Sequence, residues 1–400
     1  MKIDFKDERK QFWILNCILF NITRLITPVF RNKAIWAFGA QTGKKYDDNS
    51  MYLFEYVNKT NPNIRAIWLT RSDETVEFVR NKGYEIYNVN SKKGIHIALR
   101  AGVAFYTAGL NDFGRFPLIG GAKIVSLWHG VGFKKIYNET YSGISLVLKQ
   151  VLDFFFTWTY RNISIATSEY SKKKTIKQFG LKEKDVYITG QPRNDVFKTE
   201  ELLSDAINGR HIPETKRILL YMPTYRWATQ KEDIVPLIIK ELNDSIELKH
   251  FLEKENFIFI AKLHSKTKID NLILSDNFMV LRDEDVRSNQ KLIAISSIML
   301  TDYSSCFIDF ALLNRPIFFL VPDIEEYLIN AGGIDSDFFT LTSTNRTTSV
   351  EELCCSLFNW TDAKNLEQTN IINECFEDKL IVGTNYCENT YKKILSILKC

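Results

Sequence analysis

Residues 298–310 read IMLTDYSSCFIDF, and within this run a strand pattern changes to a helical one. Its first three residues predict a short buried strand, and the apolar residues after the serine pair recur at helical spacing. Ser304 and Ser305 therefore lie where a strand ends and a helix begins, and serine is a favoured helix N-cap. Such a turn offers backbone N–H groups, two hydroxyls and the positive end of a helix dipole, which suits a phosphate. Asp309, one turn into the helix, is placed to bind a hydroxyl of the same ligand. For this motif alone, an ordinary capped helix is the alternative.

The same alternation of apolar strands and amphipathic helices extends in both directions from this stretch. In the first half, strands are predicted at 33–40, 66–69, 84–87, 102–106, 123–128, 163–167 and 186–189. In the second half, strands are predicted at 217–221, 256–261, 298–301 and 316–321, and helices at 234–252, 350–360, 366–376 and 387–398. This pattern predicts an α/β protein whose parallel sheets are covered by helices.

Length and composition favour two domains. A chain of 400 residues is too long for one ordinary core, and 45% hydrophobic with 25% charged residues is typical of a folded protein. A polar stretch with Asn-Gly-Arg and a proline breaks the pattern near residues 200–215. The predicted division is an apolar and basic helix in 1–32, two Rossmann-like domains in 33–207 and 208–385, and a closing helix in 386–400.

The charge and the cysteines exclude several classes of function. A net charge of +4 is mild, so nucleic acid is not an expected partner. The seven cysteines form no CxxC pair and have no metal-ligand spacing with the five histidines, which predicts reduced thiols in a cytosolic protein and no zinc. The absence of a Walker motif and of a GxGxxG fingerprint disfavours P-loop and NAD chemistry.

Residues 12–22 are strongly apolar, although Asn16 and Asn21 interrupt them, and basic residues flank them on both sides. No small-residue cleavage site follows, so a secretory signal is not predicted, and the run is short for a bilayer span. Two interpretations stay open. The segment is either a helix lying in the surface of an anionic membrane or a helix packed on the first domain.

Polar residues gather directly after the predicted strands. His129 and Gly130 follow one strand in the sequence LWHGVG, with Lys134 close behind, and Arg193 lies in a Gly-Pro turn that suits a phosphate or carboxylate. A single histidine is more often structural, but a glycine turn at a strand end favours a functional role. The strand ends of the second half carry the serine pair and also Pro223, Thr224, Arg226, Lys262 and His264. Because ligands bind outside the carboxyl ends of strands in open α/β sheets, we expect two Rossmann-like halves that face each other across a ligand cleft.

Several long runs occur along the chain in a fixed order: LWHGVGFKKI (127–136), TSEYSKKKTIKQFG (167–180), ITGQPRNDVF (188–197), ILLYMPTYR (218–226), AKLH (261–264) and TDYSSCFIDFALLNRPIFFLVPDIEEY (301–327). So arranged, they resemble the CDP-glycerol glycerophosphotransferases, the primases and polymerases of teichoic acids and related capsule polymers. The likeness covers most of residues 33–330. It implies a GT-B fold, a CDP-activated polyol donor and peripheral attachment to the cytoplasmic face of the cell membrane.

The resemblance also implies roles for individual residues. It implies attack of an acceptor hydroxyl on the β-phosphorus of the donor with release of CMP, with His129 as the general base and His264 as a second essential histidine near the phosphates. The family's donor-binding positions match Arg193, Thr224, Ser304, Ser305 and Asp309. Phosphoryl transfer needs cations and N–H donors around the phosphate oxygens and one group to take the proton, so the two lines of argument agree.

This sequence departs from the family pattern at two strand ends. Val131 and Gly132 stand where the family usually has proline and threonine, and Lys262 and Ser265 stand where it commonly has arginine and proline. A lysine binds phosphate as a point charge and lacks the two-pronged geometry of arginine. The departures put the identity of the donor in question more than the type of reaction.

The predicted function is therefore transfer of glycerol phosphate from CDP-glycerol to a lipid-linked or polymeric acceptor at an anionic membrane surface. The alternatives are ribitol-phosphate transfer from CDP-ribitol, a GT-B glycosyltransferase that uses a nucleotide sugar, and a membrane-docked scaffold without activity. No protein-bound cofactor is predicted. Magnesium could assist, but no carboxylate cluster in the sequence calls for a protein-held metal.

Overall fold

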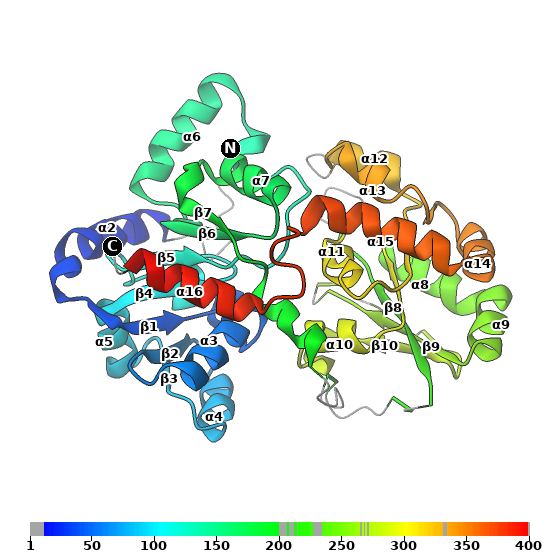
Figure 1. The fold of residues 1–400 in the computed structure, drawn as a ribbon, viewed down its shortest axis with the longest axis horizontal. Coiled ribbons are helices and arrows are strands. Elements are labelled where there is room, and N and C mark those ends of the chain that lie inside the picture. Colours follow the sequence, from blue (N-terminus) through cyan, green and yellow to red (C-terminus); the bar gives the residue numbers. More distant parts are fainter. Residues whose placement is uncertain are drawn as a thin grey trace. The chain divides into compact units, whose positions relative to one another are not determined.

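The computed structural model describes residues 12–199, 206–207, 212–213, 215–226, 234–264, 266–267, 269, 272–330 and 334–398. The chain divides into two compact units (Figure 1). Unit 1 comprises Met1–His129, Tyr137–Asp195 and Glu377–Cys400, and unit 2 comprises Gly130–Ile136 and Val196–Phe376. Residues 208–211 lie outside the described part of the chain, so the domain boundary predicted at residue 208 stays a prediction.

Among its described residues, unit 1 holds a seven-stranded parallel sheet with the order β3-β2-β1-β4-β5-β6-β7. The strands are β1 (Asn32–Phe38), β2 (Arg65–Thr70), β3 (Ile86–Asn88), β4 (Ala101–Tyr106), β5 (Lys123–Ser126), β6 (Ile163–Ala166) and β7 (Val186–Ile188). All seven strands predicted for this half are confirmed to within a few residues. The strand order reverses between β1 and β4, the place where doubly wound sheets bind ligands.

The alternation of side chains along β1 explains the two helical layers of unit 1. Trp36 and Phe38 enter one apolar cluster, and Ile35 and Ala37 enter the cluster on the opposite face. The first face is covered by α3 (Asp48–Thr60), α4 (Asp73–Asn81) and the closing helix α16 (Tyr386–Leu398). The second face is covered by α2 (Trp13–Ile26) and α5 (Lys92–Arg100). Two further helices, α6 (Gly143–Phe155) and α7 (Glu169–Phe179), flank β6 in the sequence.

Unit 2 repeats this topology with a six-stranded parallel sheet in its described part, in the order β10-β9-β8-β11-β12-β13. The strands are β8 (Arg217–Met222), β9 (Phe257–Lys262), β10 (Phe278–Leu281), β11 (Ile298–Thr301), β12 (Ile317–Leu320) and β13 (Arg346–Thr347). The sequence did not predict β10 and β13, which form the two edges. As in unit 1, the order reverses at the centre, between β8 and β11.

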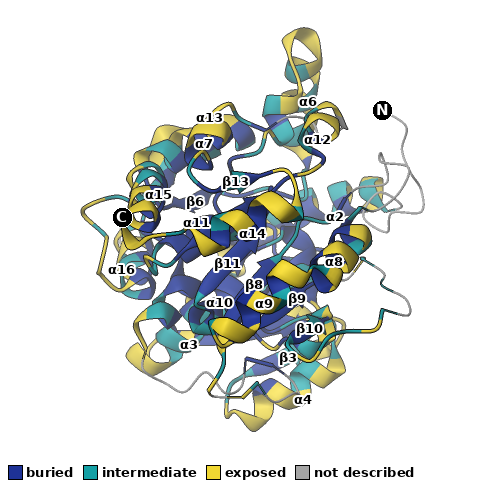
Figure 2. Cartoon of the chain, turned by 90° about the vertical axis from the view of Figure 1, so that its right-hand side faces the viewer, coloured by how far each residue is buried: buried dark blue, intermediate teal, exposed yellow. Residues whose placement is uncertain are grey.

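Helices cover both faces of the second sheet. One face packs against α8 (Val235–Asp244), α9 (Ile246–Lys254) and α14 (Val350–Phe358). On the other face, Phe319 of β12 contacts Phe307 of α11 (Cys306–Ala311) and Phe338 of α13 (Asp337–Leu341), and Phe307 also contacts Phe376 at the end of α15 (Asp362–Phe376). The short helices α10 (Asn289–Ile295) and α12 (Ile324–Asn330) complete the unit. Figure 2 shows buried strands beneath helices whose outer sides are exposed.

The single helix predicted at 234–252 was wrong. Ser245 has an extended backbone (φ −62°, ψ 122°) and separates α8 from α9. Its hydroxyl accepts a hydrogen bond from the N–H of Leu248 at 3.1 Å and so caps the second helix. The apolar periodicity continues across this break, which is why the sequence suggested one helix.

Candidate functional site

His129 lies in the turn that follows β5. Trp128 has a φ of +51°, so the left-handed conformation of this turn falls on a tryptophan rather than on Gly130 or Gly132. A bulky residue adopts such a φ only where its surroundings hold it in place. The Trp128 ring lies 4.9 Å from the Phe179 ring and 4.4 Å from the His129 ring, between centroids, and its carbonyl accepts a hydrogen bond from Asn49 at 2.9 Å.

The hydrogen bond of the His129 ring determines its tautomer. Nδ1 lies 2.9 Å from the carbonyl oxygen of Thr107, at the end of β4. Because a carbonyl only accepts, Nδ1 carries the proton and Nε2 presents a lone pair. Although His129 is exposed, desolvation lowers its pKa below the ordinary value of 6.5, against the opposing effects of the Thr107 carbonyl and the Asp48 charge. The ring is therefore neutral at pH 7 and able to accept a proton.

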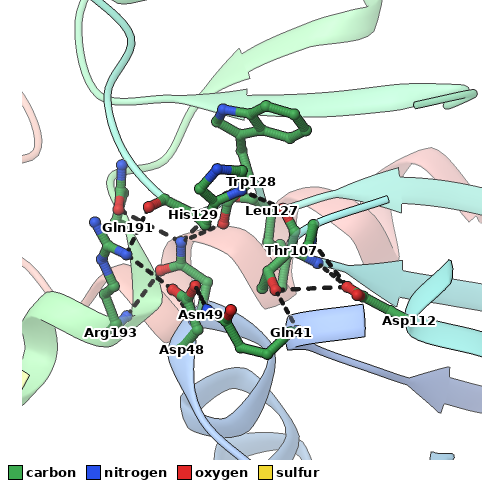
Figure 3. A network of polar contacts seen from close by, with 11 residues as sticks. Gln41, Asp48, Asn49, Thr107, Asp112, Leu127, Trp128, His129, Gln191 and Arg193 are labelled. Atoms are coloured by element: carbon green, nitrogen blue, oxygen red, sulfur yellow. Dashed lines mark hydrogen bonds and ion pairs between the residues drawn. The ribbon is translucent and has the colours of Figure 1, made fainter. Parts of the chain in front are cut away.

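A buried polar network holds the His129 turn (Figure 3). Arg193, after β7, pairs through Nη1 with Asp48 at 2.9 Å and donates to the His129 carbonyl at 3.0 Å. Asn49 accepts a hydrogen bond from the N–H of Arg193 at 3.1 Å. Sequence reasoning selected Arg193 as a ligand-binding residue and missed Asp48 and Asn49, although these two follow the loop at the end of β1.

Asp112 fixes the loop that supplies the Thr107 carbonyl. Its fully buried carboxyl accepts hydrogen bonds from the N–H groups of Thr42 at 2.6 Å, Thr107 at 2.8 Å and Ala108 at 2.9 Å. Desolvation raises the pKa of Asp112 to about 7, and the three N–H donors oppose this shift. Asp112 could not be predicted from the sequence, because the two loops that it joins are far apart in the chain.

Asp302 is the corresponding centre of unit 2. It is fully buried at the end of β11, and it accepts hydrogen bonds from the N–H of Thr224 at 2.8 Å and from Arg226 Nη1 at 2.7 Å. Arg226 also donates from Nε and Nη2 to Asp323, at 2.8 and 3.0 Å. Two carboxylates and one guanidinium thus connect the ends of β8, β11 and β12. Arg226 was predicted to bind substrate, but its described hydrogen bonds go to these two carboxylates and to the Thr224 carbonyl, and its guanidinium lies over the Tyr303 and Tyr327 rings.

Replacing Arg226 with methionine is expected to destabilise unit 2. The substitution leaves Asp302 and Asp323 buried without their cation, a change that costs about 3–5 kcal/mol. Urea unfolding followed by circular dichroism measures the difference. Arg217→Met is the matched control, because Arg217 is exposed at the start of β8 and its loss should cost less than about 1 kcal/mol. Equal unfolding midpoints for the two variants would contradict this assignment.

The serine turn and Thr224 present hydroxyl groups beside this centre. The helix after β11 begins at Cys306, as expected, but the Ser305 hydroxyl makes no capping hydrogen bond. The Thr224 hydroxyl is buried and has no hydrogen-bond partner among the described residues. Because β8 and β11 are neighbouring parallel strands, the hydroxyls of Thr224 and Ser305 both follow the carboxyl ends of strands at the centre of the sheet. Asp309 is buried in the first turn of the same helix, and Pro223 immediately precedes Thr224.

Lys134 belongs to unit 2, in the short segment Gly130–Ile136. Its Nζ donates to the Tyr327 hydroxyl at 3.0 Å, and the Tyr327 ring stacks on Tyr303 with centroids 3.8 Å apart. Desolvation lowers the pKa of Lys134 to about 8, although the negative charge of Asp302 opposes the shift. The structure thus brings this lysine to the ends of β11 and β12, as a cation near the serine turn.

His264, after β9, has the opposite tautomer to His129. Its Nδ1 accepts a hydrogen bond from the N–H of Lys266 at 3.2 Å, so the neutral ring carries its proton on Nε2. The ring is exposed and stacks on Tyr225, with centroids 5.1 Å apart. Lys262, at the end of the same strand, pairs with Asp283 at 3.0 Å. No group of three or more potential metal ligands occurs in the described part of the chain.

Two Rossmann-type units with polar clusters at the carboxyl ends of their strands define a GT-B protein. A solved variant of the wall teichoic acid polymerase TagF shares this fold, with a TM-score of 0.73 at 20% identity over 100% of both chains. The family model for CDP-Glycerol:Poly(glycerophosphate) glycerophosphotransferase matches residues 19–379, and the chain therefore belongs to this family. The resemblance found in the sequence is confirmed.

Two curated relatives show how far the similarity extends. The chain is 26% identical over 330 residues to a teichoic acid poly(glycerol phosphate) polymerase of Bacillus subtilis, covering 78% of this chain and 41% of the polymerase. It is 32% identical over 215 residues to a teichoic acid ribitol-phosphate primase of Bacillus spizizenii, covering 51% of this chain and 52% of the primase. The matches thus span about half of each relative or less.

Proposed function

We propose that the protein transfers glycerol phosphate, or a similar polyol phosphate, from a CDP-activated donor to an acceptor hydroxyl. The oxygen–phosphorus bond to the acceptor forms, the bond to CMP breaks, and the hydroxyl proton passes to the protein. The observation that carries the proposal is the opposite tautomers of the two strand-end histidines, one with a lone pair and one with an N–H on Nε2. Family membership supports the same reaction.

In unit 1, His129 is the general base of this proposal. Its Nε2 takes the proton of the acceptor hydroxyl, and the Thr107 carbonyl stabilises the imidazolium that forms on Nδ1–H. Arg193 acts as a positioning residue, because it is buried and holds the backbone of the base. Gly130 follows the base and leaves room for the acceptor.

In unit 2, we assign a set of hydrogen-bond donors and one cation to the phosphate oxygens of the CDP-activated donor. These are the hydroxyls and N–H groups of Thr224, Ser304 and Ser305, the Lys134 ammonium, and the Nε2–H of His264. Asp309 is proposed to bind a hydroxyl of the donor. Pro223 orients the Thr224 loop, and Arg226 and Lys262 act as positioning residues, because both are bound to carboxylates.

Product analysis tests the proposal. The purified protein is incubated with CDP-glycerol and an acceptor in membranes, and the products are resolved by chromatography and ³¹P NMR. We expect CMP and a new phosphodiester in equal amounts. A second incubation contains a nucleotide sugar in place of CDP-glycerol. Release of a nucleoside diphosphate together with a new glycoside in that incubation would overturn the proposal in favour of a glycosyltransferase. A parallel reaction with CDP-ribitol decides the donor, because one of the relatives is a ribitol-phosphate primase.

An apolar surface on unit 1 supports attachment to the cytoplasmic face of an anionic membrane. Helix α2 packs on unit 1 through the fully buried Phe20, and its other side is exposed. The segment Trp13–Phe30 has a mean hydropathy of 1.5 and is only 22% buried. Helix α6 lies beside it, since Asn21 donates to the Phe155 carbonyl at 2.7 Å. Together they expose the apolar surface: Ile14, Ile18, Leu25, Ile144, Val147, Leu148, Val151 and Phe154.

Polar substitutions on the apolar surface are expected to release the protein from membranes. The triple variant Ile144→Ser, Leu148→Ser, Val151→Ser removes three exposed aliphatic side chains, each of which contributes about 1.5–3 kcal/mol when buried. Co-sedimentation with anionic vesicles should therefore weaken at least tenfold (about 1.4 kcal/mol). The matched control is Ile246→Ser with Ile329→Ser, two exposed isoleucines of unit 2. Equal binding of both variants would contradict the membrane assignment.

A further inference from the structure

Unit 1 also holds a cavity whose lining does not include His129. It is a cavity of about 430 Å³ bounded by α6, by the segment before β6 and by the end of α7. Its lining includes Phe154 of α6, Arg161, Phe179 and Leu181. Phe154 is 67% exposed and belongs to the apolar surface, so the cavity opens beside that surface.

Arg161 is the unusual residue of this cavity. It is only 6% exposed, and its guanidinium lies 3.6 Å from the centroid of the Phe179 ring and 4.9 Å from that of Trp128. Its Nε donates to the Thr159 carbonyl at 2.9 Å. Within the described part of the chain, neither terminal nitrogen meets the geometry of a hydrogen bond, although the Tyr106 hydroxyl is near enough to interact with the guanidinium. An arginine stays charged in proteins, and a buried charge without a partner is costly.

The carboxylates near the cavity are paired with lysines, and a second arginine, Arg24, lies with its guanidinium 5.8 Å from the Phe154 ring centroid and 5.3 Å from the Tyr160 ring centroid in the lining. Lys149 and Asp153, four residues apart on α6, form an ion pair in the lining. Lys174 of α7 pairs with Glu139 at 2.9 Å. The Tyr106 hydroxyl donates its hydrogen bond to the Thr159 carbonyl at 2.9 Å. The positive charge of Arg161 is thus left for an anion that enters from outside the chain.

We propose that this cavity binds a phosphate group of the acceptor, with the two terminal nitrogens of Arg161 donating to two phosphate oxygens. The inference rests on the proposed function for the identity of the acceptor. Two sources share this chemistry, the diphosphate of a lipid carrier and the phosphodiester of a polyol-phosphate chain. The apolar surface beside the opening favours the lipid diphosphate, because its hydrocarbon chain would lie along α6.

Calorimetric titration of the full chain tests the site without relying on turnover. Saturating CDP is present throughout, so that phosphate sites in unit 2 do not contribute under the proposed function. The probes are inorganic pyrophosphate, geranyl diphosphate and glycerol 3-phosphate. Arg161→Gln is expected to weaken pyrophosphate binding about 10–100-fold, the effect of losing hydrogen bonds to a charged group. Arg80→Gln, at an exposed arginine of α4, makes the same charge change and should bind like the original protein.

A second variant fills the cavity and leaves Arg161 in place. Leu181→Trp should weaken pyrophosphate binding as much as Arg161→Gln does, and it decides the matter alone if the arginine variant fails to fold. Equal binding by the original protein and either folded variant, or no binding by the original protein, overturns the site. If geranyl diphosphate binds at least tenfold more tightly than glycerol 3-phosphate, the source is the lipid diphosphate, and the reverse order assigns the polyol-phosphate chain. If CDP does not bind, the proposed function fails, but the difference between the variants still tests the cavity.

Discussion

Replacing His129 with asparagine is expected to lower the rate of polyol-phosphate transfer by about 10²–10⁴-fold, the contribution of a general base. The asparagine amide can donate to the Thr107 carbonyl as Nδ1–H does, so the turn should keep its structure. It has no basic lone pair in the position of Nε2. Steady-state CMP release measures the loss, and calorimetry with CDP-glycerol should show donor affinity within about threefold of the original protein, less than about 0.7 kcal/mol.

Two further measurements separate loss of the base from loss of structure. His96→Asn, at an exposed histidine of α5, should transfer at the normal rate. In the original protein, activity should fall with decreasing pH as His129 is protonated, and because its pKa is lowered, the midpoint of that fall lies below pH 6.5. The His129→Asn variant should lack this dependence. A midpoint above pH 7, or normal turnover in the variant, would show that His129 is not the base.

Replacing His264 with alanine is expected to lower the transfer rate by about 10²–10³-fold, the usual effect of removing one donor to a developing negative charge. The Lys266 N–H places the proton of His264 on Nε2, so the residue should act as a hydrogen-bond donor. A glutamine side chain can place an N–H at a similar distance from the backbone. We therefore expect His264→Gln to be at least tenfold more active than His264→Ala, about 1.4 kcal/mol.

The two histidines should thus respond in opposite ways to the same substitution. Glutamine restores a donor and cannot restore a base, so His129→Gln should remain as inactive as His129→Ala. His250→Gln, at an exposed histidine of α9, is the matched control in unit 2. Rescue by glutamine at position 129, or its failure at position 264, would contradict the tautomers assigned here.

The strands of both sheets could be predicted largely from the sequence because they are buried and apolar. The exceptions have physical reasons. The edge strand β13 has only two residues and carries little pattern, and β10, although its four residues match the length of several predicted strands, is buried only at its two ends. The break at Ser245 depends on one capping hydroxyl, and it leaves the apolar periodicity on both sides unchanged.

The candidate site was predictable as a set of cations and hydroxyls at strand ends, and less so as a set of roles. Arg193, Arg226 and Lys262 were all selected as ligands, but in the structure each is paired with a carboxylate. Which strand ends meet is decided by sheet order, and sheet order is not local in the sequence. For the same reason the tautomers of the histidines could not be predicted, since their partners are backbone groups of other segments.

The left-handed tryptophan of unit 1 has a consequence for variants of this region. The Trp128 ring centroid lies 4.9 Å from the guanidinium carbon of Arg161 and 4.4 Å from the centroid of the His129 ring. A smaller side chain at position 128 would therefore remove packing from the buried cation and from the histidine at once, so a variant at this position affects both proposed roles together.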